Sequence, residues 1–169
     1  MKKVVLLISF IVSAWCVDAQ FQASRLTFGG GIGLQSGDYT VVNIAPQVGY
    51  DFTNYFNAGG GLTYTYYKEK YDNIKQTNSY FGLNLYGKLY PIPYIVLMVQ
   101  PEVNRMWRTY KNTQTGWVEK TEKLVPVCLV GAGVRLGPMS LMLQYDLARD
   151  DYSPYGNRIF YSVGYTFNL

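Results

Sequence analysis

The chain has 169 residues, no histidine and a formal net charge of +4. A charge this small and dispersed does not predict a nucleic-acid partner, and the absence of imidazole removes the commonest metal ligand. The length is that of one domain, and 17 tyrosines with 17 glycines favour close-packed β structure with interfacial aromatic rings.

Residues 1–19 have the pattern of a secretory signal peptide. Two lysines precede an apolar run at 4–17, and we expect cleavage after Ala19. The run is shorter than the ~20 residues that a membrane-spanning helix needs. Cleavage before a lipidated Cys16 is an alternative, but the bulky Trp15 at the preceding position disfavours it.

The remaining domain, 20–169, keeps one cysteine, Cys128, which excludes a disulfide framework. Apolar and polar residues alternate in this domain at period two, the spacing of a strand with one apolar and one polar face. No helical period of useful length appears. Eight alternating runs follow one another, at 25–35, 42–52, 57–66, 81–89, 95–104, 124–136, 140–147 and 158–169.

The connections between these runs alternate in length. Tight turns at 53–54, 91–93 and 137–138 follow the second, fourth and sixth runs. Longer polar segments follow the third, fifth and seventh runs, at 68–77, 109–120 and 149–157. Short turns on one rim and long loops on the other are typical of outer-membrane barrels. The first connection, 36–38, is the exception, because it is short on the rim that should carry long loops.

Three prolines, at 46, 101 and 126, fall inside the predicted strands. Each removes one backbone donor from the hydrogen-bonding ladder, and a closed barrel has no free edge to accommodate the loss. Bulges can absorb such residues, so we expect local irregularity at these three positions.

The direction of the two faces decides between a membrane barrel and a soluble ligand-binding barrel. The apolar face is continuous and edged by tyrosine and tryptophan, as contact with lipid requires. The polar face lacks the dense lysine and glutamate of a sheet that faces water. We therefore predict an all-β fold, an eight-stranded antiparallel up-and-down transmembrane β-barrel, with a soluble secreted barrel as the less favoured alternative.

Charged residues on the polar face then lie in the barrel interior. We predict that they form a network of hydrogen bonds and salt bridges that fixes the strand register, rather than a proton or ion path, because eight strands leave a narrow lumen. The predicted network consists of Arg25, Asp51, Lys88, Glu102, Arg135 and Asp146.

The signal peptide, the eight runs and the aromatic C-terminal strand together resemble the small OmpA-like and OmpX-like outer-membrane barrels. More narrowly, the mature chain is similar to barrel-only proteins of the porin family, with an outer membrane protein β-barrel domain. The resemblance implies the outer membrane of a Gram-negative bacterium, with its lipid and lipopolysaccharide as surroundings. It also implies that the barrel-assembly machinery recognises the last strand, through Tyr161, Tyr165, Phe167 and Leu169.

The resemblance brings no catalytic, cofactor or metal motif to this chain. Enzymes among outer-membrane barrels use a histidine as acid or base, and this chain has none. We therefore predict a non-enzymatic barrel with a plugged lumen and a structural or surface-interaction role. The alternative is an accessory subunit of an envelope secretion or uptake complex, with a protein partner.

Overall fold

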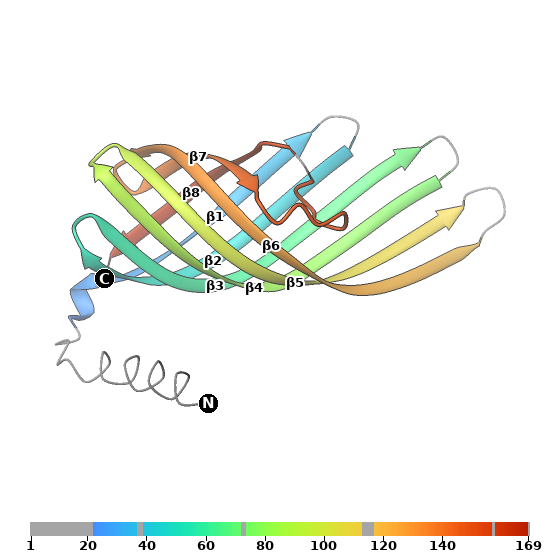
Figure 1. Cartoon of the computed structure of the whole chain (residues 1–169), viewed down its shortest axis with the longest axis horizontal. Coiled ribbons are helices and arrows are strands. Elements are labelled where there is room, and N and C mark those ends of the chain that lie inside the picture. Colours follow the sequence, from blue (N-terminus) through green and yellow to red (C-terminus); the bar gives the residue numbers. More distant parts are fainter. Residues whose placement is uncertain (1–21, 37–38, 72–73, 113–116, 157, 169) are drawn as a thin grey trace, which may run out of the picture.

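The computed structural model describes residues 22–36, 39–71, 74–112, 117–156 and 158–168. Eight antiparallel strands follow each other around a closed barrel, in which each strand pairs with the next and the last pairs with the first (Figure 1). The predicted fold class is confirmed. The predicted signal peptide at 1–19 and the C-terminal Leu169 lie outside the described residues.

A single 3₁₀ turn, η1 (Ala23–Arg25), leads into the first strand. The strands are β1 (Leu26–Ser36), β2 (Tyr39–Thr53), β3 (Phe56–Tyr71), β4 (Ile74–Ile92), β5 (Ile95–Asn112), β6 (Val118–Leu136), β7 (Met139–Asp146) and β8 (Phe160–Asn168). Tight turns join β2 to β3, β4 to β5 and β6 to β7. Gly137 has a φ of +63° in the last of these turns, a conformation that glycine adopts without strain. Within the described ranges, no helix is long and apolar enough to cross a membrane.

The apolar face of the strands lies on the outside of the barrel. On β4, Leu83 and Leu85 are 67% and 66% exposed, whereas Asn84 between them is 3% exposed. The same alternation on β5 exposes Val103 and buries Glu102. Buried polar groups are costly without hydrogen bonds, so the inward polar side chains are expected to pair mostly with one another.

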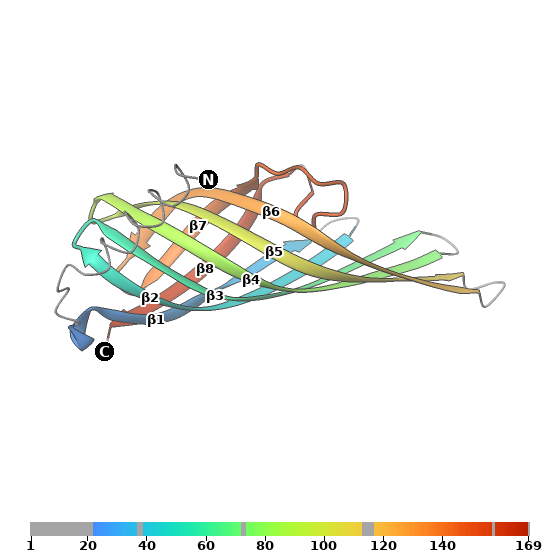
Figure 2. The same ribbon diagram turned by 60° about the horizontal axis from the view of Figure 1, so that its bottom comes forward.

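Two of the three predicted long loops are shorter than predicted, because the strands beside them are longer. Strand β3 continues to Tyr71 and β4 begins at Ile74, while β5 continues to Asn112 and β6 begins at Val118. Polar residues in these stretches indicated exposure to water, but backbone pairing does not require an apolar face. The resulting hairpins project beyond β7 and β8 on one side of the barrel (Figure 2). The third loop lies in the β7–β8 connection as predicted, and its described residues contain no strand.

Two of the three strand prolines accompany a lapse in pairing, and none of the three coincides with a register shift. The pairing of β2 with β3 lapses at Ala45 and Pro46 and then resumes in the same register. Strand β5 pairs with β6 through Pro101, and its lapse against β4 leaves that register unchanged. Pro126 lies beyond the β6–β7 pairing, which begins at Leu129. The expected irregularity is therefore a local loss of pairing, and the register shifts lie beside the β2–β3 and β4–β5 turns instead.

Candidate functional site

The barrel interior is the candidate site, and its central acidic group is Glu102 on β5. The side chain is 4% exposed and its carboxylate accepts three hydrogen bonds. The donors are Thr63 Oγ1 at 3.2 Å, Gln100 Nε2 at 3.2 Å and Asn104 Nδ2 at 2.8 Å. A carboxylate taken out of water is tolerated only with such compensation, so this cluster holds β3 and β5 in one fixed arrangement.

Neutral amides connect this cluster to the buried lysine of β4. Gln47 on β2 donates to Gln100 at 2.9 Å and to Asn84 at 3.4 Å, and Asn84 in turn donates to Thr63 at 2.7 Å. The ammonium of Lys88 donates to Gln47 at 3.4 Å and lies 4.6 Å from the ring centroid of Tyr86. One chain of hydrogen bonds therefore crosses the lumen through β2, β3, β4 and β5.

Asp51 and Arg135 lie near the tight turns. Asp51 accepts hydrogen bonds from Asn57 at 2.7 Å and from Asn168, near the end of β8, at 2.8 Å. The guanidinium of Arg135 lies 4.6 Å from the ring centroid of Tyr90, and its Nε donates to the carbonyl of Gly137 at 3.1 Å. Both residues are partly exposed, so they belong to the rim of the interior.

Arg25 does not join the interior network. It lies in η1, before β1 begins, where it is exposed and donates to the carbonyl oxygen of Phe52 at 3.3 Å. The alternation of the first run had placed it on the inner face, but the chain is not yet extended at this residue.

Asp146 is fully buried at the end of β7 and holds the start of the β7–β8 connection. Its carboxylate accepts from the backbone N–H groups of Cys128 and Ala148, both at 3.0 Å, and from Ser153 Oγ at 2.6 Å. Two of these three donors belong to the connection itself. The connection is therefore fixed to the barrel wall at the point where it leaves the strand.

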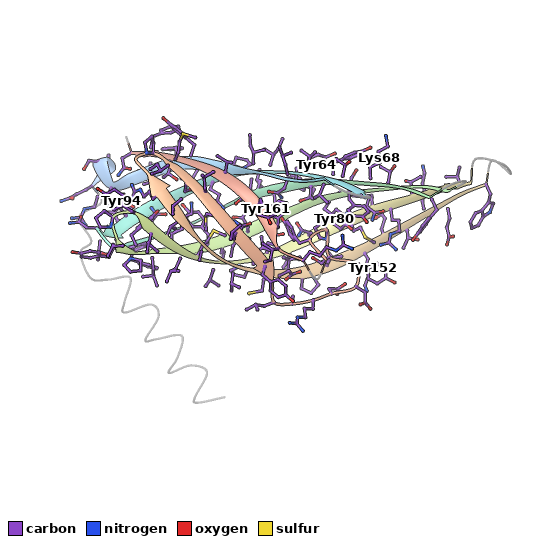
Figure 3. The ribbon with its side chains drawn as sticks, turned by 90° about the horizontal axis from the view of Figure 1, so that it is seen from above. Tyr64, Lys68, Tyr80, Tyr94, Tyr152 and Tyr161 are labelled. Atoms are coloured by element: carbon purple, nitrogen blue, oxygen red, sulfur yellow. The ribbon has the colours of Figure 1, made fainter. Side chains whose placement is uncertain are left out.

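The connection, 147–159, which we call the plug segment, turns back to the barrel and buries Tyr155. The hydroxyl of Tyr155 accepts a hydrogen bond from Asn43 at 3.0 Å, and its ring meets Phe160 edge-on at 5.0 Å. Burial raises the pKa of the Tyr155 hydroxyl well above its usual range, as does the neighbouring Glu102 carboxylate, so the group stays protonated. Tyr152 lies beside Tyr80, whose hydroxyl donates to the Tyr152 carbonyl at 3.0 Å (Figure 3).

An apolar layer surrounds Tyr155 inside the barrel, where the sequence predicted a polar interior. Phe160, the one aromatic residue on the polar face of the last run, belongs to this layer. Its ring occupies the space beside Gly33, where a Cβ atom would overlap the ring. The layer consists of Val41, Tyr80, Met106, Val125, Val127, Leu129, Tyr155 and Phe160.

The space that remains around Lys88 is small. Two hollows border this residue, with volumes of about 30 and 10 Å³. A space of this size holds about one water molecule.

Of the six predicted network residues, five lie in the interior or at its rim, and no ion pair joins any two of them in the part of the chain that the structure describes. The predicted salt bridges are therefore wrong, and neutral amides, hydroxyls and backbone groups take their place. An ion pair between described residues, Arg105 with Glu122 at 2.6 Å, lies on the outer face near the projecting hairpins. Among the described residues, no group of three or more carboxylate or thiol side chains could hold a metal ion.

No protein-family model and no curated protein matches the chain. Among solved structures, the chain is similar to Ail, the attachment invasion locus protein of Yersinia pestis. The identity is 15%, the match covers 84% of this chain and 96% of that chain, and the TM-score is 0.54. The complex of Ail with the heparin analogue sucrose octasulfate matches at the same identity and coverage with a TM-score of 0.52. The fold is that of an eight-stranded outer-membrane barrel.

A third match is to a protein of another bacterium. The N-terminal β-barrel domain of Pseudomonas aeruginosa OprF is 13% identical, over 85% of this chain and 98% of that chain, with a TM-score of 0.47. Identities this low concern the fold alone.

In this outer-membrane barrel fold, β8 closes the ring against β1 over Thr27–Leu34. Tyr161, Tyr165 and Phe167 point outward, where about half of each side chain is exposed. They therefore lie on the face that the barrel presents to its surroundings. Recognition of this strand by the barrel-assembly machinery stays a prediction.

Proposed function

We propose that the chain is an integral outer-membrane barrel of a Gram-negative bacterium, non-enzymatic, with a closed lumen and a structural or surface-interaction role. Its surroundings are then outer-membrane lipid and lipopolysaccharide, and its insertion depends on the barrel-assembly machinery. The narrower resemblance to OmpA-like and porin-family barrels is part of this proposal.

The observation that supports a closed lumen best is the position of Tyr155. Its ring and hydroxyl fill the interior between Asn43 and Phe160, and the Glu102 cluster lies against it. Eight strands enclose a space that side chains can fill, whereas open porins have about 16 strands. The tyrosine and the amide network together support a lumen without a permanent pore.

A non-enzymatic role is supported by the state of the interior carboxylates. Glu102 and Asp146 each accept three hydrogen bonds and are buried, so neither is free to act on a substrate from outside. The chain also has no histidine to serve as a proton acceptor. A surface-interaction role is favoured by the hairpins that project beyond the barrel (Figure 2).

Planar-bilayer recording of the purified mature protein tests the closed lumen. We expect no stable large channel, and at most rare small openings. Steady, ion-selective conductance that changes with Glu102→Ala would contradict the proposal. Extraction of the protein from cells without detergent would contradict membrane insertion and favour the soluble barrel instead.

A pull-down from detergent extracts tests the accessory-subunit alternative. A surface protein with a structural role should purify alone, whereas an accessory subunit should bring the same envelope protein in stoichiometric amounts each time. Capture of that complex would replace the structural role with the alternative.

A further inference from the structure

The outer wall of the barrel carries an apolar groove over β1, β2 and β8. Its volume is about 720 Å³. The floor is formed by Gly30 and Pro46, which pair with each other across β1 and β2. A Cβ atom at Gly30 would lie 2.6 Å from the carbonyl oxygen of Ala45, so a larger residue cannot fill the floor. Ile44, Leu62 and Tyr165 belong to the surrounding walls.

The lining of the groove selects an apolar occupant. None of the described residues that line it is charged, and the one long polar side chain among them, Gln47, points inward and donates to Gln100. If the groove stayed empty, the atoms that line it would lack dispersion contacts on their open side. A flexible hydrocarbon chain can follow such a groove. A second copy related by a two-fold axis would place groove against groove and leave a void, because such an interface must be self-complementary.

The position of the groove along the barrel selects the leaflet. Met139, the first residue of β7, and Phe167, near the end of β8, both line it, so it reaches the rim with the tight turns. In outer-membrane barrels the short turns face the periplasm. The groove therefore opens into the periplasmic leaflet of the bilayer.

An exposed cation lies at the same rim. Arg25 in η1 precedes the groove residue Phe28 by three residues, about 10 Å of extended chain. Its guanidinium donates to the carbonyl oxygen of Phe52, and none of the described carboxylates is within ion-pair distance of it. Arginine binds phosphate well because its planar fork of donors matches the phosphate oxygens.

We propose that the groove binds one acyl chain of a phospholipid from the periplasmic leaflet and that Arg25 pairs with the phosphate of the same lipid. The proposal rests on the membrane insertion proposed above. The groove supplies shape and apolar contact for the chain, and η1 supplies the charge at the depth of the headgroup.

The test reconstitutes the mature protein in nanodiscs that contain phosphatidylethanolamine and phosphatidylglycerol with a photoreactive diazirine in one acyl chain. After illumination, mass spectrometry maps the labelled peptides. We expect labelling to concentrate on β1, β2 and β8 relative to the outer face of β4 and β5. Leu62→Trp fills the groove and should lower this labelling several-fold.

Leu83→Trp is the matched control for Leu62→Trp. Leu83 pairs directly with Leu62 across β3 and β4, faces outward and does not line the groove. It should leave the labelling of β1, β2 and β8 unchanged. Equal effects of the two tryptophans would overturn the acyl-chain site.

The headgroup contact has its own pair of variants. Native mass spectrometry of protein released from the nanodiscs counts the phospholipids that remain bound. Arg25→Gln should lower the retention of one phospholipid about tenfold, as loss of a charge-assisted contact predicts. Arg105→Gln, which removes an exposed cation near the opposite end of the barrel, should not. Unchanged retention in Arg25→Gln would overturn the role of Arg25.

The outcomes separate this proposal from the proposed function. Even labelling around the whole wall, with the barrel intact on gels, would overturn the groove and leave the membrane barrel standing. No acyl labelling on any strand would contradict membrane insertion itself. In a separate sample, a photoreactive diazirine analogue of leucine at position 62 that crosslinks one copy of the protein to another would replace the lipid with a second copy of the chain.

Discussion

At the scale of single residues, the buried acids of this barrel are balanced by neutral donors. Glu102 accepts from a hydroxyl and two amides, and Asp146 accepts from two backbone N–H groups and a hydroxyl. A buried ion pair often stabilises little, because desolvating two charges costs as much as their attraction returns. Several fixed dipoles around one carboxylate avoid desolvating a second charge.

We expect Glu102→Gln to lower the free energy of unfolding by about 1–3 kcal/mol. The amide keeps one acceptor oxygen and places an NH₂ group at the other position. That NH₂ group then faces either Asn104, which donates to Oε1, or the pair Thr63 and Gln100, which donate to Oε2 in the native protein. Urea unfolding in detergent micelles measures the change.

Glu122→Gln is the control for this substitution. Its carboxylate pairs with Arg105 on the outer face, where both side chains are more than half exposed. Exposed pairs contribute at most about 1 kcal/mol, so this variant should unfold close to the native midpoint. Equal losses of unfolding free energy in the two variants would show that the hydrogen bonds of Glu102 do not stabilise the interior more than an exposed ion pair does.

At the scale of elements, the plug segment lies where the wall of the barrel is built from the two shortest strands, β7 and β8. These strands have 8 and 9 residues, whereas β4 and β6 each have 19. The wall is therefore low on one side, and the segment turns back to the interior there (Figure 1). Asp146 fixes its beginning and Tyr155 fixes its middle.

We expect Tyr155→Ala to release the plug segment while the strands stay paired. Deleting a large buried ring costs about 3–5 kcal/mol, and here the loss falls on a connection that can leave the interior. Limited proteolysis of the unboiled protein should cut within 147–159, and bilayer recording should show more frequent small openings. Tyr94→Ala, at an exposed tight-turn residue, should do neither. A protected segment in Tyr155→Ala would show that other contacts hold the plug.

At the scale of the whole molecule, closure of the ring and an apolar outer wall act together. Every strand has two paired neighbours, so the barrel offers detergent no long free edge except where the hairpins project. We expect unboiled and boiled samples to migrate differently on detergent gels, because the closed barrel resists unfolding until it is heated. Identical migration in several detergents would contradict closure.

The outer wall gives a second prediction at this scale. Leu143 is outward-facing on β7, four residues from the tight-turn rim, and arginine near the bilayer midplane costs about 2–4 kcal/mol. Leu143→Arg should therefore reduce the heat-modifiable fraction in membranes. Leu136→Arg, also outward but at the rim, should cost about 0–1 kcal/mol, because arginine there reaches the headgroups. Equal damage from both variants would place the membrane at a different height.

The sequence by itself determined the class of the fold and the direction of each face. Alternation at period two fixes which residues share a face, and it predicts Leu83 outside and Asn84 inside, as the barrel has them. Composition also showed that the inward face is poor in charge. These properties are local, because they depend only on the geometry of one extended strand.

Only the tertiary structure decided which interior groups meet. Gln100 and Asn104 flank Glu102 at a spacing of two on β5, so alternation already places them on its face. Thr63 reaches Glu102 from β3 because strand tilt and register bring the two strands together around the lumen, and alternation carries no information about that stagger. The return of Tyr155 to the interior was equally hidden, since a polar connection of this composition predicts exposure. The length of the projecting hairpins could not be predicted from the sequence either. The hydrophobic pattern indicates which side chains are buried, whereas backbone pairing stabilises a strand whether or not its side chains are buried.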